Sequence, residues 1–151
     1  MPRRDVSLSP EEVRSFLAGR RTGALATIGR GGFPHQVAMW YVPEPDRLLM
    51  WTYRSSQKAA NLYRDPRASV LVEDGDTYGT LRGVLVQGEA QLLEDLEVVT
   101  EIGNRLRQRY AGEGDQDVES VRAGVAAQAP KRVGIALPLT RVISWDHRKL
   151  G

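Results

Sequence analysis

Short stretches of alternating apolar and polar residues are separated by turn-forming residues over most of the chain, which is typical of a β-rich fold. Gly29-Arg30-Gly31-Gly32 and Pro43-Glu44-Pro45-Asp46 are the clearest of these turns. We expect strands over residues 24–28, 35–42, 47–53, 68–73 and 83–93. One last strand, bent at Pro138, is expected over residues 133–137 and 141–145.

Helical patterns are fewer and lie before or between these strands. Ser9-Pro10-Glu11-Glu12 predicts a helix start, because the serine can cap, the proline fits the first turn and the second glutamate completes a capping box. Further helices are expected over residues 57–64, 95–111 and 117–127, with a break at Gly112-Glu113-Gly114-Asp115. The apolar stripe of the longest helix consists of Leu96, Val99, Ile102, Leu106 and Tyr110.

Strands in hairpin order with mostly peripheral helices favour a mainly β fold, namely an antiparallel barrel with α additions. Regular strand–helix alternation is absent, which argues against a parallel doubly wound sheet. At 151 residues the chain is expected to form one domain, residues 1–151. Small barrels of this kind bind ligands at their mouths or at subunit interfaces.

The composition, 41% hydrophobic and 26% charged, is that of an ordinary soluble protein. No apolar run could span a bilayer and no apolar signal core follows Met1, so we expect a cytoplasmic protein that does not contact a membrane. The lack of cysteine excludes disulfides and thiolate catalysis, and two histidines make a histidine-rich metal site unexpected. The net charge of +2 is small and its cations are dispersed, which argues against a nucleic-acid partner.

A candidate anion site lies where the strand over residues 47–53 meets the following helix. Arg54, Ser55, Ser56 and Lys58 gather at this helix start. Free backbone N–H groups at a helix start attract anions, and neighbouring cations reinforce that attraction. The segment is neither a Walker loop nor a dinucleotide glycine fingerprint. It predicts a phosphate site, and a solvated basic turn is the alternative.

Several short segments occur in a recognisable order along the chain. They are Gly32-Phe33-Pro34, Trp51-Thr52, Ser56-Gln57-Lys58, Asn61-Leu62, Asp65-Pro66-Arg67, residues 82–90 and Arg141-Val142-Ile143-Ser144-Trp145. Together they resemble the split-barrel flavin-binding family that includes pyridoxamine 5'-phosphate oxidase and its deazaflavin (F420)-dependent relatives. The resemblance implies an antiparallel split β-barrel with peripheral helices, and a homodimer with cofactor clefts between its subunits.

The resemblance also implies a set of cofactor-binding residues. These are Gln36, Val37, Ala38, Met39, Trp51, Thr52, Arg54, Ser55, Ser56, Gln57, Lys58, Asn61 and Trp145. The first four line the cofactor ring and its ribityl chain, and Trp51-Thr52 contacts the same cofactor. Ser56-Gln57-Lys58 holds the phosphate, with Asn61 one turn further on, while Arg54 has no fixed family counterpart and adds a cation. Trp145 reaches the cofactor across the dimer interface; for both tryptophans, plain packing is the alternative.

Other side chains are given roles by the chemistry of the expected cofactor. A tricyclic ring needs flat apolar walls, for which Met39, Met50 and Trp51 are suited. Arg82 either meets the cofactor or pairs with Glu73 or Asp74. No Ser-His-Asp, paired-carboxylate or metal arrangement stands out, so we expect neither an obligatory catalytic side chain nor a metal. Hydride chemistry fits this pattern, because the cofactor performs the difficult step.

Two departures from the oxidase pattern favour the F420-dependent branch. Gln57 stands where the pyridoxamine oxidases place a second basic residue, and Asp146-His147-Arg148 replaces their Arg-x-His substrate element after Trp145. The resemblance thus implies an oxidoreductase in which reduced F420 delivers hydride to an electron-poor small molecule, such as an enone, a quinone or a tetrapyrrole. An FMN-dependent oxidase or reductase and a non-catalytic flavin or F420 carrier are the alternatives.

Overall fold

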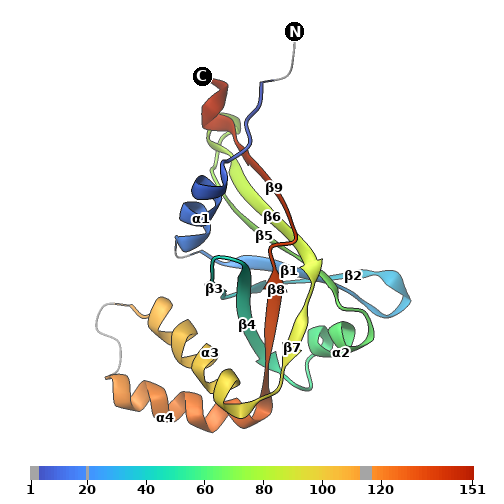
Figure 1. Cartoon of the computed structure of the whole chain (residues 1–151), viewed down its shortest axis with the longest axis vertical. Coiled ribbons are helices and arrows are strands. Elements are labelled where there is room, and N and C mark those ends of the chain that lie inside the picture. Colours follow the sequence, from blue (N-terminus) through green and yellow to red (C-terminus); the bar gives the residue numbers. More distant parts are fainter. Residues whose placement is uncertain (1–3, 20, 113–116) are drawn as a thin grey trace.

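The computed structural model describes residues 4–19, 21–112 and 117–151, which form two antiparallel sheets (Figure 1). The spatial order of the first sheet is β2 (Pro34–Met39), β1 (Gly23–Ile28), β5 (Arg67–Asp74), β6 (Arg82–Glu89) and β9 (Arg141–Asp146). The order of the second is β3 (Val42–Pro43), β4 (Arg47–Tyr53), β8 (Arg132–Pro138) and β7 (Gln91–Leu93). The prediction of a mainly β, antiparallel fold is confirmed.

Helices lie around these sheets. They do not connect parallel strands, because both sheets are antiparallel. They are α1 (Pro10–Ala18), α2 (Gln57–Arg64), α3 (Leu96–Arg109) and α4 (Val118–Gln128). The predicted capping box of α1 is confirmed, because the Ser9 hydroxyl accepts from the Glu12 N–H and the Glu12 carboxylate accepts from the Ser9 N–H. Apart from Gly112, the glycine-containing break expected over residues 112–115 lies outside the described residues.

The main core lies between the two sheets. Inward-facing residues of the first sheet meet those of the second, and α1 closes one end with Val13, Phe16 and Leu17. Met50 on β4 is fully buried in this cluster, so its predicted role as a cofactor wall is wrong. It alternates with Leu49, which packs on the opposite side of β4 against Ile102 of α3.

Three of the expected strands are divided in the structure. The strand expected over residues 35–42 ends at Met39, and β3 then pairs in the other sheet. Residues 83–93 divide at Ala90 into β6 and β7, and the last expected strand divides into β8 and β9. In each case the two pieces belong to different sheets, because a barrel made of two sheets requires strands to change partners. Such a change depends on distant pairing, which local alternation does not report.

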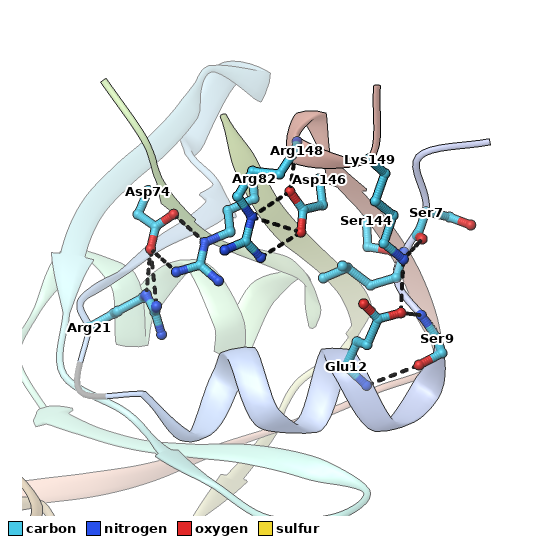
Figure 2. A network of polar contacts seen from close by, with 11 residues as sticks. Ser7, Ser9, Glu12, Arg21, Asp74, Arg82, Ser144, Asp146, Arg148 and Lys149 are labelled. Carbon is cyan, nitrogen blue, oxygen red and sulfur yellow. Dashed lines mark hydrogen bonds and ion pairs between the residues drawn. The ribbon is translucent and has the colours of Figure 1, made fainter. Parts of the chain in front are cut away.

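Figure 2 shows a polar network that ties α1 and the C-terminal residues to the first sheet. Asp74 accepts from Arg82 at 2.6 Å and from Arg21 at 3.0 Å, so Arg82 forms one of the two predicted ion pairs. Arg148 pairs with the buried Asp146 at 2.7 Å, and the Asp146 N–H donates to the Val6 carbonyl. This network holds β9, which carries Trp145, in place beside β6.

Candidate functional site

Hydroxyls and an ammonium group gather where β4 ends and α2 begins. The Lys58 Nζ donates to Thr52 Oγ1 at 3.2 Å, and Thr52 Oγ1 donates to Ser56 Oγ at 3.1 Å. Ser56 caps α2 by accepting from the Ala59 N–H at 3.2 Å. Three of the predicted site residues are thus brought together in one hydrogen-bonded cluster, hereafter the Lys58 cluster (Thr52, Ser56 and Lys58).

The first turn of α2 adds free backbone donors to this cluster. Within the described residues, the N–H groups of Gln57 and Lys58 have no acceptor, whereas the next two are bonded to Ser56. The first N–H groups of a helix lack partners within it and carry its positive dipole end. The cluster therefore presents hydroxyls, an ammonium and two N–H donors to the same region, which is the donor set that an oxyanion requires.

The charge of the site is not neutralised by any residue that the structure describes. Burial, and next the positive charge of Arg132, lower the pKa of the Lys58 ammonium below its ordinary value. Over the described residues no carboxylate pairs with Lys58. A cation that is partly desolvated and lacks a counter-ion favours an incoming anion.

Behind the cluster, α2 is fastened to the first sheet through Asn61. This side chain is fully buried, donates to the Thr27 hydroxyl at 3.0 Å and accepts from the Gln57 amide at 2.8 Å. Thr27 lies opposite His35 in the β1–β2 register, and the buried His35 Nδ1 has no partner within the described residues. Asn61 and Gln57 therefore position α2 on β1, the strand that pairs with β2. Whether either residue contacts a cofactor stays a prediction.

The predicted cofactor strand, β2, is an edge of the first sheet, so one side of its backbone faces away from β1. Gln36 and Ala38 are exposed, while Val37 and Met39 are half-buried. An edge strand presents unpaired N–H and C=O groups that can bond to a ligand lying along it. The side chains of Gln36 and Ala38 are thus open to a ligand, whereas Met39 packs against the main core. The contacts of all four residues with a cofactor stay predictions.

Trp51 and Thr52 point to opposite sides of β4, as neighbouring strand residues must. Thr52 joins the Lys58 cluster, whereas the Trp51 ring packs on Gly103 of α3. A Cβ at Gly103 would lie 2.5 Å from this ring, so a glycine is needed to seat it. The structure gives the Trp51 ring a packing role, and its predicted contact with a cofactor stays untested.

Trp145 is far from the Lys58 cluster within one chain. It lies on β9, and β9 and β2 are the two opposite edges of the five-stranded sheet. Four strand spacings separate these edges, roughly 19 Å. The Trp145 ring covers Gly83, where a Cβ would lie 2.5 Å from it. If Trp145 contacts the cofactor held by α2, it does so from another copy of the chain.

Two further predicted residues lie at the rim of the site. The Arg54 N–H donates to the Lys131 carbonyl at 2.9 Å and its Nε to the Arg132 carbonyl at 3.2 Å, while Ser55 is exposed. Arg132 was not expected there from the sequence. Its signal is a basic pair, Lys131-Arg132, in front of an apolar strand, but placing it requires the pairing of β8 with β4.

The face of the first sheet that points away from the core carries small and apolar side chains. The register places on it Ala24, Ala26, Ile28, Ala38, Leu71, Leu85 and Ile143. None of these belongs to the buried clusters of the described residues. A hollow of about 820 Å³ opens on this face beside Ala26, Ile28 and Gln87, and the Lys58 cluster does not line it. We refer to this surface as the outer face.

Comparison with known proteins identifies the family. A model of the pyridoxamine 5'-phosphate oxidase family matches residues 9–146. The conserved hypothetical protein Rv2991 from Mycobacterium tuberculosis is 44% identical, with 100% of this chain and 92% of that chain covered and a TM-score of 0.87. An F420 reductase is 25% identical, with 86% and 94% covered and a TM-score of 0.69.

General Stress Protein 26 from Bacillus anthracis str. Sterne shares the fold at 23% identity, with 90% of this chain and 92% of that chain covered and a TM-score of 0.64. These matches confirm the split-barrel fold that the resemblance implied. No helix within the described ranges has the length and apolar character needed to cross a membrane. The chain belongs to the pyridoxamine 5'-phosphate oxidase-like split-barrel family.

Proposed function

We propose that this protein is a cytoplasmic F420-dependent oxidoreductase that transfers hydride from the reduced deazaflavin to a small electron-poor substrate. The observation that carries the proposal is the Lys58 cluster, a set of anion-binding donors at the start of α2 with no carboxylate partner among the described residues. The likeness to an F420 reductase at 25% identity supports the deazaflavin branch of the family. Gln57, in place of a second basic residue, supports it as well.

The residues present fit a phosphorylated cofactor with a flat ring. Thr52, Ser56 and Lys58 would hold phosphate oxygens, because they supply two hydroxyls and one ammonium. The free edge of β2 would lie along the ring, since its backbone groups face away from β1. When bound, a reduced deazaflavin supplies the hydride. The chain itself binds and orients, and we assign no catalytic side chain and no metal to it.

We further propose that the protein acts as a homodimer with cofactor clefts between its subunits. Two observations support this arrangement. The outer face presents apolar side chains that the chain does not bury in its own clusters, including Leu71 and Ile143. Trp145 and β2 lie at opposite edges of one sheet, so a second copy is needed to bring this tryptophan to the cleft.

An FMN-dependent oxidase or reductase is the second candidate, and family membership favours it directly. The donor set of the Lys58 cluster would hold the phosphate of FMN as well as that of F420. A non-catalytic carrier of either cofactor is the third candidate, since binding needs no catalytic group. The first two differ in cofactor, and the third differs from both in turnover.

The test is a side-by-side titration of the purified apo-protein with F420 and FMN. Binding is measured by the quenching of the fluorescence of its three tryptophans. Tight binding of F420 with weak binding of FMN is the expected result. The reverse order would move the protein to the FMN branch, and binding of neither would overturn the proposal. Oxidation of reduced F420 in the presence of enones or quinones then separates a reductase from a carrier, which would show binding without turnover.

A further inference from the structure

Arg132 is held in an unusual position at the start of β8. It lies opposite Tyr53 in the β4–β8 register, and its guanidinium carbon is 3.8 Å from the centre of the Tyr53 ring. The same carbon is 4.7 Å from the centre of the Trp51 ring. Trp51 and Tyr53 project from the same side of β4, because they are two residues apart. Cation–π contact with two rings therefore orients the guanidinium plane.

The donors of this guanidinium have no acceptor in the described part of the protein. Its Nε is buried and has no partner, and across the described ranges none of its nitrogens forms a hydrogen bond or ion pair. An unsatisfied buried donor is costly, so native proteins retain few of them. The planar fork of arginine suits carboxylate and phosphate oxygens, which it binds with two parallel hydrogen bonds.

Arg132 also shares its surroundings with other cations. Its positive charge contributes to lowering the pKa of Lys58, and its carbonyl accepts from the Arg54 Nε at 3.2 Å. Neither Arg132 nor Lys58 has a carboxylate partner in the described part of the chain. The repulsion between like charges that lack a counter-ion decreases when an anion binds between or beside them.

The two cations approach the end of β4 from different sides. Lys58 bonds to Thr52, which points toward the main core, whereas Arg132 contacts Trp51 and Tyr53 on the side that faces α3. One phosphate held by the Lys58 cluster would therefore leave Arg132 available for another charge. A ligand that satisfies both cations must carry a second anionic group beyond its phosphate.

We propose that Arg132 binds a second anionic group of the cofactor and thereby selects a cofactor that carries carboxylates beyond its phosphate. This inference rests on the proposed function, because it takes the Lys58 cluster as the phosphate site. It adds a specificity-determining residue to that site. F420 has such carboxylates and FMN does not, so Arg132 favours F420 over FMN.

The test compares two substitutions of Arg132 with a matched control. Arg132→Met retains an unbranched side chain against the two rings and removes the charge, and Arg132→Lys retains the charge without the fork. Arg122→Met removes an exposed arginine from α4 and serves as the control. Circular dichroism and thermal unfolding establish that each variant is folded before the dissociation constants for F420 and FMN are measured.

We expect Arg132→Met to weaken F420 binding at least tenfold and FMN binding less than threefold, with Arg132→Lys intermediate and Arg122→Met unchanged. Wild-type affinity for F420 in the methionine variant would overturn the inference. Equal losses for F420 and FMN would overturn it too, because Arg132 would then hold the phosphate that the two cofactors share.

Failure of the proposed function has a different signature, since the wild-type protein would then bind neither cofactor. Inorganic pyrophosphate then serves as the probe, because it offers two linked anionic groups. We expect it to raise the thermal midpoint of the wild type and of Arg122→Met but not that of Arg132→Met. Equal shifts in all three proteins, or no shift in the wild type, would show that Arg132 does not bind an anion with Lys58.

Discussion

The ammonium of Lys58 lies 3.2 Å from the hydroxyl of Thr52, and this hydrogen bond joins the last inward-facing residue of β4 to the first turn of α2. The bond leaves two further N–H positions of the ammonium for other acceptors. Thr52 is buried and Lys58 is half-buried, so the ammonium is held at the surface of the site and its motion is restricted.

Removing the charge of Lys58 is expected to weaken cofactor binding. In Lys58→Met the side-chain stem is retained and the ammonium is lost, so a charge-assisted hydrogen bond to phosphate is lost with it. We expect the dissociation constant for F420 to rise at least tenfold, or by about 1.4 kcal/mol or more. Lys131→Met, which removes an exposed lysine directly before β8, is the control. Unchanged affinity in Lys58→Met would remove Lys58 from the phosphate site.

The affinity of the site for anions is expected to decrease at alkaline pH. Burial and the charge of Arg132 lower the pKa of Lys58 from its ordinary value of 10.5, and an anion binds the charged form. Affinity should therefore be constant near neutral pH and decrease as pH rises through the lowered pKa, before 10.5 is reached. Titrations with F420 from pH 7 to 10 measure this decrease. In Lys58→Met the decrease should be absent.

The same shift has a consequence for the stability of the apo-protein, with the sign opposite to that of a paired lysine. The folded state disfavours the charged form of Lys58, which lowers the free energy of unfolding. This loss of stability is fully present below the lowered pKa. It fades as pH rises from that pKa toward 10.5, where the unfolded lysine also loses its proton. The free energy of unfolding of the wild type should therefore increase relative to that of Lys58→Met over this range.

Two helix glycines provide a test of how Trp51 is seated. At Gly103 of α3 a Cβ would lie 2.5 Å from the Trp51 ring and 2.8 Å from Val125, whereas at Gly124 of α4 nothing lies within 4 Å. Gly124→Ala is expected to stabilise the protein by up to about 1 kcal/mol through helix propensity. Gly103→Ala should destabilise it by about 1–2 kcal/mol, because overpacking outweighs the same gain.

Urea unfolding gives both free energies, and tryptophan emission reports the displacement of the Trp51 ring in Gly103→Ala. If both alanine variants were stabilised alike, the ring would not need the glycine, and the packing role assigned to Trp51 would be wrong.

Local patterns predicted those parts of the fold that depend on neighbouring residues. The strand expected over residues 47–53 and the helix expected over residues 57–64 are present with those bounds as β4 and α2. The serine cap of α1 follows equally from four consecutive residues. The division of residues 83–93 at Ala90 does not follow from the local sequence, because β6 and β7 differ only in the distant strands with which they pair.

The candidate site shows the same distinction. Ser56, Lys58 and Thr52 are close in sequence, so their convergence follows from one strand and one helix turn. Arg132 is brought to Tyr53 by the β4–β8 pairing across a long stretch of chain, which no local pattern reports. The chemistry of Met50 alone predicts a cofactor wall, but the alternation of β4 places this residue in the core.

A mixed dimer tests whether each cleft combines two chains. If α2 comes from one copy and Trp145 from its partner, a dimer of one Lys58→Met chain and one Trp145→Ala chain has one intact cleft and one doubly altered cleft. Refolding the two variants together at equal amounts makes half of the dimers mixed, so about a quarter of all clefts should regain wild-type affinity for F420. Each variant alone should have none.

The matched control mixes Lys58→Met with Ser56→Ala, which alter the same side of the cleft. Every cleft in that mixture carries one substitution, so no wild-type affinity should return. Sedimentation of the wild type establishes the dimer on which the experiment depends. A dimer whose Lys58→Met and Trp145→Ala mixture regains nothing would place the whole cleft within one chain. If Trp145→Ala alone keeps wild-type affinity for F420, Trp145, at the far edge of the sheet from β2, has only its packing role over Gly83.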